Sequence, residues 1–117
     1  MTESMTSQKA MDYAVKIVEL HKELVHKKKE FQIADQIKRS GTAIGALLCE
    51  AKFAESTADY IHKMKIALKE CHETEYWLTI LQKTDYLTNE KYHELMNDNT
   101  EIKRMLISSI KTLQDKK

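Results

Sequence analysis

The hydrophobic positions along the chain repeat at helical spacing, most regularly in the stretch from Ala34 to Ala51. Apolar or small residues there alternate three and four positions apart, which places them in one stripe along a helix. The stripe consists of Ala34, Ile37, Gly41, Ile44, Leu48 and Ala51. The chain has two glycines, Gly41 and Gly45, and both lie inside this helical stretch. A glycine inside a helix costs roughly 1 kcal/mol relative to alanine. Because the two glycines share a face, we expect a central helix that another backbone approaches closely.

Three further segments carry the same periodicity, so the pattern predicts four helices near residues 7–28, 31–54, 57–83 and 88–115. Residues 1–6 are polar and expected to be frayed, with Ser7 as the first N-cap. Ser56 and Thr88 are N-cap candidates for the third and fourth helices. A run of polar residues at 97–100 weakens the fourth helix midway and predicts a kink or a frayed turn there.

Each of these helices has its own apolar stripe. In the first it comprises Ala10, Ala14, Ile17, His21, Leu24 and Lys28; in the third Tyr60, Met64, Ala67, Cys71, Thr74, Leu78 and Leu81; in the fourth Tyr92, Leu95, Asn99, Ile102, Leu106, Ile110 and Leu113. The third helix also has a second apolar side made of Ile66, Trp77 and Ile80. A lone bundle does not need that side, so we expect another subunit to pack there.

Length and composition agree with one helical domain spanning residues 1–117. The chain has 117 residues, 32% of them charged and 42% hydrophobic, and contains no proline. Four helices joined by short connections must alternate in direction. The predicted fold class is therefore all-α, an up-down-up-down antiparallel four-helix bundle.

Charge is nearly balanced, at a formal +1, yet lysines gather at one predicted end. In an antiparallel bundle the first and third connections lie together, which brings together Lys27, Lys28, Lys29, Lys83 and Lys91. The opposite end collects Glu50, Glu55 and Asp59. The lysine run is either a solvated helix terminus that complements the helix dipole or part of a patch for an anionic partner.

A polar set is predicted between the second and third helices. Antiparallel pairing about residues 55–56 places Arg39 within reach of Glu73 or Glu75, and places Gln36 opposite Glu75. A bridge that fixes the register of the two helices is favoured over a ligand site.

Signals for catalysis, metals and membranes are weak. The chain has one Glu-x-x-His pair, Glu90 and His93, in the first turn of the last helix, whereas a di-iron bundle site needs two such pairs and two further glutamates. Cys49 and Cys71 lack Cys-x-x-Cys spacing and are expected to be reduced. The first residues lack a basic segment followed by an apolar run, so we expect no signal peptide, and no apolar run approaches about 20 residues. We therefore expect a non-enzymatic cytoplasmic protein with no cofactor, no metal and no membrane contact.

The segments ADQIKRSGTAIGALLCEA and IALKECHETEYWL resemble the small bacterial four-helix-bundle proteins encoded within intervening sequences of large-subunit ribosomal RNA. That family also includes the accessory variability protein of diversity-generating retroelements. The matching positions are Gln36, Ile37, Lys38, Arg39, Ser40, Ile44, Glu50, Ile66, Ala67, Leu68, Glu73 and Glu75. Family members commonly have proline where Gly45 stands. The resemblance implies ring-shaped homopentamers and, in the retroelement branch, binding of nucleic acid and a reverse transcriptase through basic surfaces.

Three hypotheses follow. The first is a homo-oligomeric module that binds RNA, DNA or a nucleic-acid enzyme through a basic rim. The second is a protein–protein scaffold, favoured by the two-sided third helix and the low net charge. The third is an enzyme or metal protein, for which Glu90, His93 and His72 are the candidates.

Overall fold

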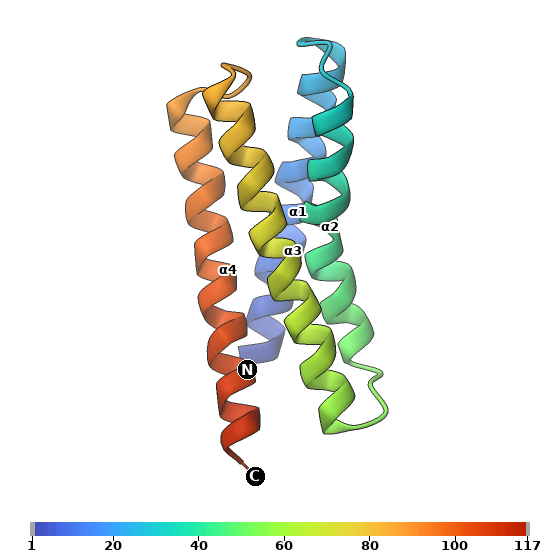
Figure 1. Cartoon of the computed structure of the whole chain (residues 1–117). Helices are drawn as coiled ribbons and strands as arrows, with labels where there is room; N and C mark the ends of the chain where they lie inside the picture. The colour runs from blue at the N-terminus through green and yellow to red at the C-terminus, as the bar shows by residue number, and fades with distance from the viewer. Residues whose placement is uncertain (1, 117) are drawn as a thin grey trace.

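Four long helices of alternating direction make up the structure, a computed structural model that describes residues 2–116 and the side chains of residues 5–116. They are α1 (Thr2–His26), α2 (Gln32–Ala51), α3 (Thr57–Lys83) and α4 (Asn89–Asp115). The connections α1–α2 and α3–α4 lie at one end, the upper end in Figure 1, and the α2–α3 connection lies at the other. The molecule measures 49 × 22 × 20 Å. The predicted all-α, up-down-up-down bundle is confirmed.

The helices pack in cyclic order, each against its two neighbours in the chain, with α4 closing against α1. The α1–α4 seam is the least extensive of the four. The side chains that face the common axis form one buried core of aliphatic residues with Tyr13, Met64 and Cys71 among them. Burial of this core is the main stabilising contribution to the fold.

The predicted stripe of α2 matches its buried face, and those of α3 and α4 match except at their ends, where Tyr60, Tyr92 and Leu113 are half-buried. The buried face of α1 differs more. All six stripe positions of α2 are buried. In α1, Tyr13 and Leu20 are buried beside Ala10, Ile17 and Leu24, while Ala14 and His21 are half-buried. Lys28, the last predicted stripe position, lies beyond the helix end and is exposed. The larger apolar area of Tyr13 and Leu20 outweighs that of Ala14 and His21, so the helix is rotated to bury them.

The first two helices have different ends from those predicted. α1 begins at Thr2, so Ser7 lies inside the helix and is not its N-cap. The expected fraying is wrong for residues 2–6, of which Thr6 is only 1% exposed. Met1 lies outside the described residues. α2 ends at Ala51 because the next three amides bond to the third carbonyl back rather than the fourth, as in Ala54 N–H to Ala51 O at 3.1 Å. This tighter turn closes the helix before the α2–α3 connection.

The helix starts of α3 and α4 are as predicted. Ser56 Oγ accepts from the Asp59 amide at 3.0 Å, and Thr88 Oγ1 accepts from the Lys91 amide at 3.1 Å, which confirms both N-caps. α4 runs without interruption through residues 97–100, so the predicted kink or frayed turn is wrong. Asn99 faces the core, and its amide donates to Tyr13 Oη at 3.2 Å. Because the Asn99 side chain bonds to Tyr13, it does not compete for the backbone hydrogen bonds of α4.

Candidate nucleic-acid interface

The connection between α1 and α2 holds three consecutive lysines in an exposed turn. The helix ends at His26, and the backbone N–H groups of Lys27 and Lys28 both donate to the Glu23 carbonyl oxygen, at 2.9 and 3.2 Å. Lys29 has a φ of 57°, in the left-handed region, where the chain turns toward α2. All three side chains are exposed at the tip of the bundle, just past the helix end on which they were predicted.

Glu30 follows the three lysines, and its carboxylate caps the start of α2. One carboxylate oxygen accepts from the Ala34 amide at 2.8 Å and the other from the Ile33 amide at 3.3 Å. The carboxylate thus lies against the positive end of the α2 dipole. Phe31, the N-cap residue by position, makes no side-chain cap bond and is 53% exposed.

The α3–α4 connection lies at the same end and supplies the other lysines. Asp85 has a φ of 68°, its amide donates to Gln82 O at 3.2 Å, and the Tyr86 amide donates to Leu81 O at 2.8 Å. These two bonds form a Schellman motif, which satisfies carbonyls at the end of α3. Lys83 is exposed in the last turn of α3, and Lys91 is exposed in the first turn of α4.

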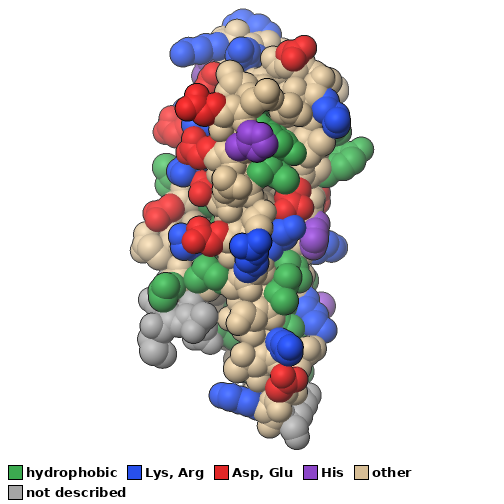
Figure 2. All heavy atoms as spheres, turned by 90° about the vertical axis from the view of Figure 1, so that its left-hand side faces the viewer, with side chains coloured by type: hydrophobic (Ala, Val, Ile, Leu, Met, Phe, Trp, Pro, Cys, Tyr) green, Lys and Arg blue, Asp and Glu red, His purple; other side chains and the backbone are tan. Residues whose placement is uncertain are grey.

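The structure therefore brings Lys27, Lys28, Lys29, Lys83 and Lys91 to one end, as predicted, and we call this set the lysine end. Figure 2 shows blue side chains at its tip. Among residues 5–116, Lys27, Lys28, Lys29 and Lys83 form no ion pair, whereas Lys91 lies 3.3 Å from a Glu94 carboxylate oxygen. Four of the five cations are thus available to an external anion.

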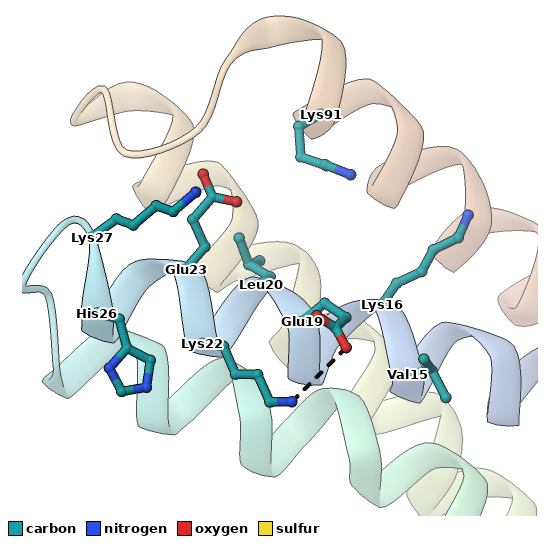
Figure 3. A pocket seen from close by; sticks show the side chains of 9 residues that line it. All are labelled: Val15, Lys16, Glu19, Leu20, Lys22, Glu23, His26, Lys27 and Lys91. Atoms are coloured by element: carbon teal, nitrogen blue, oxygen red, sulfur yellow. Dashed lines mark ion pairs between the residues drawn. The ribbon is translucent and has the colours of Figure 1, made fainter.

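A groove of about 520 Å³ runs below the lysine end, between α1 and the start of α4. Figure 3 shows Lys27 and Lys91 on either side of it, with Leu20 in its floor. Lys16, also in the groove, contacts Asp98 at 2.8 Å and Glu94 at 3.0 Å, and its hydrogen bond to Asp98 is the main cause of its raised pKa. Of the lysines that line the groove, Lys16, Lys22 and Lys91 are paired with carboxylates, and Lys27, which belongs to the lysine end, is not.

The opposite end has a mixed charge. Glu50, Glu55 and Asp59 lie there as predicted, but Lys63 pairs with Glu50 at 3.0 Å and Lys52 is exposed beside them. Among the described side chains both signs occur at this end, so they form no acidic patch to match the lysine end.

The predicted bridge between α2 and α3 exists, with Glu73 and also Glu70 as partners. The Arg39 guanidinium contacts the Glu73 carboxylate directly and lies 3.3 Å from Glu70 Oε1. Trp77 Nε1 donates to the same Glu73 carboxylate at 3.1 Å. The hydrogen bond from Arg39 lowers the pKa of Glu73. Arg39 is half exposed, so the pair links two helices at the surface.

Glu75 and Gln36 do not belong to this bridge. Glu75 contacts Lys103 of α4 at 2.5 Å. Positions 73 and 75 differ by about 200° around a helix, so Glu73 faces α2 and Glu75 faces α4. Gln36 is exposed and borders a surface pocket beside Trp77. The predicted polar set therefore divides between two seams and the surface.

Two buried polar pairs were not predicted from the sequence. Thr74 Oγ1 donates to Ser40 Oγ at 2.8 Å between α2 and α3, and Asn99 donates to Tyr13 between α4 and α1. Ser40 could have been assigned to the core, because it lies between Ile37 and Ile44 on the stripe face. No comparable signal links Tyr13 to Asn99, which are 86 positions apart.

The titratable core groups are protonated and suited to packing. Burial raises the pKa of Tyr13, and it raises the pKa of the Cys71 thiol to about 12. A thiol with so high a pKa is a poor nucleophile. Within residues 5–116, no three His, Cys, Asp or Glu side chains are placed to hold a metal ion, and Glu90 and His93 are both exposed.

The second apolar side of α3 is half-buried within the single chain. Ile66, Trp77 and Ile80 each retain part of their exposure, and Trp77 packs against the core. Its ring meets that of Tyr76 edge to face, with centroids 5.2 Å apart. Tyr76 itself is 61% exposed, so the outer surface of α3 keeps an aromatic patch.

None of the helices described between residues 2 and 116 has the length and apolar character needed to cross a bilayer.

Comparisons with known proteins place the chain in a family. Residues 2–108 match the model of the family described as 23S rRNA-intervening sequence protein, a description that names no enzymatic reaction. A crystal structure of a protein of unknown function from the S23 ribosomal protein family of Bacteroides thetaiotaomicron is 51% identical, with a TM-score of 0.94. That similarity covers 95% of this chain and 99% of the other. No curated protein sequence matches. Since the family model covers nearly the whole chain, the chain belongs to the 23S rRNA-intervening sequence protein family.

Proposed function

We propose that the chain is a non-enzymatic, homo-oligomeric binding module that contacts nucleic-acid backbone through the lysine end. One observation carries this proposal: Lys27, Lys28, Lys29 and Lys83 are exposed together at one end and have no carboxylate partner among residues 5–116. Lysines without partners can take the place of the counterions around phosphates, which is the sequence-independent part of nucleic-acid binding.

Oligomerisation would raise the affinity of the lysine end for nucleic acid. The formal charge of one chain is only +1, so a single copy has a weak field. A pentamer, as the resemblance implies, repeats the lysine end around a ring, and several weak contacts to one strand then act together. The proposed site is thus a multivalent basic rim in a cytoplasmic protein.

The comparisons suggest which polyanion to test first. The family carries 23S rRNA in its description, and the related crystal structure is assigned to a ribosomal protein family. We therefore place RNA ahead of DNA as the ligand, with a reverse transcriptase or another nucleic-acid enzyme as a further partner.

The test is titration of RNA and DNA at low and at physiological salt, comparing the wild type with a Lys27→Glu, Lys28→Glu, Lys29→Glu variant. A Lys52→Glu, Lys65→Glu, Lys111→Glu variant changes the net charge equally at exposed positions outside the lysine end. We expect salt-sensitive binding that the first variant loses and the second retains. Absent binding at low salt, or equal losses in both variants, would overturn the proposal.

A protein–protein scaffold is the second candidate. Its support is the exposed apolar surface of α1, where Met5, Met11 and Val15 are each more than half exposed, together with Tyr76 on α3. A scaffold would form the same oligomer and bind no nucleic acid at any salt concentration. The titration therefore separates the two functions.

A further inference from the structure

Phe31 is an exposed aromatic residue beside the lysine run. It is the last residue of the α1–α2 connection and is 53% exposed. Two peptide units separate it from Lys29, so the two Cα atoms lie at most about 7.6 Å apart. A cation and an aromatic ring therefore share one short exposed segment.

Local structure does not require an aromatic side chain at this position. Phe31 is absent from the buried core cluster, and Glu30 provides the side-chain cap of α2. Its backbone carbonyl accepts from the Asp35 amide at 3.0 Å, a bond available to any residue. The phenyl group makes no cap bond and adds exposed apolar surface at the tip of the bundle.

We propose that Phe31 is a base-stacking residue, so that the lysine end selects single-stranded nucleic acid over duplex; this inference rests on the proposed function. Lysines can contact the phosphates of either form. The flat face of a base is covered by its neighbours in a duplex, whereas an unpaired base offers that face to an aromatic ring. Lys27–Lys29 and Phe31 supply the two contacts that a single strand needs.

The acidic residue within this segment does not oppose the proposal. Glu30 lies between Lys29 and Phe31, and a free carboxylate there would repel phosphate. Its two oxygens instead accept backbone amides of α2, which positions the charge against the helix terminus. The outer surface of the connection is thus left to the lysines and the ring.

Phe53 provides a matched control within the same chain. It also lies in a connection and is 85% exposed, but it belongs to the opposite end, where its neighbours are one lysine, Lys52, and the carboxylates of Glu50 and Glu55. If exposure alone made a stacking site, Phe53 would be the better one. The lysine run is what distinguishes Phe31.

The experiment measures dissociation constants for single-stranded RNA, single-stranded DNA and duplexes of equal length. The proteins are the wild type, Phe31→Ala, Phe31→Trp and Phe53→Ala. Stacking is worth about 1–3 kcal/mol per base, so Phe31→Ala should weaken binding of both single strands by about 5- to 150-fold per site. Duplex binding should be unchanged, Phe31→Trp should retain the single-strand preference, and Phe53→Ala should match the wild type.

The failures are distinguishable. Equal wild-type affinity for single strands and duplexes, or a Phe31→Ala variant that keeps the single-strand preference, overturns the stacking role while the lysine-dependent binding stands. A wild type that binds neither form overturns both. Because both phenylalanines are exposed, we expect each variant to fold, and circular dichroism and the melting temperature check this.

Discussion

At the residue scale, the two glycines of α2 face α1 with different clearances. A Cβ atom at Gly41 would lie 2.9 Å from both Cγ atoms of Ile17, a β-branched side chain with no exposed surface. A Cβ atom at Gly45 would lie 3.5 Å from the Ala10 Cβ, an ordinary van der Waals contact. Gly41 therefore sets how closely the two helices approach, and Gly45 does not.

This difference predicts opposite effects of the same substitution. Gly41→Ala should destabilise the fold by about 1–2 kcal/mol, because overpacking exceeds the gain in helix propensity, and Gly41→Leu by several kcal/mol. Gly45→Ala should stabilise it by up to about 1 kcal/mol. Urea unfolding midpoints with unchanged slopes measure both effects. An unchanged midpoint for Gly41→Ala would contradict the close contact with Ile17.

Lys29 occupies a backbone conformation that glycine adopts more easily. A φ of 57° costs a residue with a side chain about 1–2 kcal/mol. The two glycines of the chain both lie inside α2, so none is used at this turn. A strained residue kept at an exposed turn is a reason to suspect a function for its side chain. This agrees with the role proposed for the lysine end.

Lys29→Gly should accordingly stabilise the fold by about 1 kcal/mol while weakening nucleic-acid binding. Lys28→Gly is the control, because Lys28 does not have a positive φ and glycine there gains nothing. Thermal melts and the salt-dependent titration are compared for both variants. A Lys29→Gly variant less stable than Lys28→Gly would show that the turn is not strained.

At the element scale, a pair of polar side chains lies across each seam of the bundle. His21 Nε2 lies 2.8 Å from Asp35 between α1 and α2, Arg39 contacts Glu73 between α2 and α3, and Lys103 contacts Glu75 between α3 and α4. Lys16 contacts Asp98 between α1 and α4. Each pair joins one helix to one neighbouring helix, so together the four pairs favour this cyclic order.

The Arg39–Glu73 pair should contribute less than about 1 kcal/mol, since Arg39 is half exposed. The pKa of Glu73 is lowered, so the contribution is present at neutral pH and is lost as the pH falls below the ordinary glutamate value of about 4.3. Glu73→Gln should therefore lower stability at pH 7 and have little effect near pH 3. Urea midpoints at the two pH values test this. A loss of several kcal/mol at pH 7 would mean that the pair is buried.

Most element-scale features could be predicted from sequence, and the failures have local causes. Periodicity identified the core faces of α2, α3 and α4, because apolar residues occupy those positions almost continuously. It misassigned α1, because apolar residues such as Met11, Ala14 and Val15 surround Tyr13 in sequence and several faces of the helix therefore look apolar. The hydroxyl partner of Tyr13 is Asn99, far along the chain. It grouped Glu73 with Glu75, although two positions along a helix point to different neighbours. The lysine end followed from topology, but the exposure of Phe31 did not.

At the scale of the whole molecule, one bundle leaves large apolar side chains uncovered. Met11 and Val15 on α1, Tyr76 on α3 and Ile107 on α4 are each at least half exposed, and Ile66, Trp77 and Ile80 are half-buried. Scattered apolar residues are normal on a protein surface, but a patch along one helix favours association. The patch on α3, made of Ile66, Tyr76, Trp77 and Ile80, includes the aromatic pair Tyr76–Trp77.

The last prediction is that the protein self-associates through this face of α3. Light scattering at micromolar concentration should give several times the 13.7 kDa of one chain. Ile66→Lys with Ile80→Lys should reduce that mass, because two buried charges at an interface are costly. Ile107→Lys, on the exposed face of α4, should not change it. Trp77 is left intact because its ring packs against the core and its indole donates to Glu73. A monomeric wild type would end the idea of a basic rim, whereas an oligomer that persists in the double variant would locate the interface on another helix.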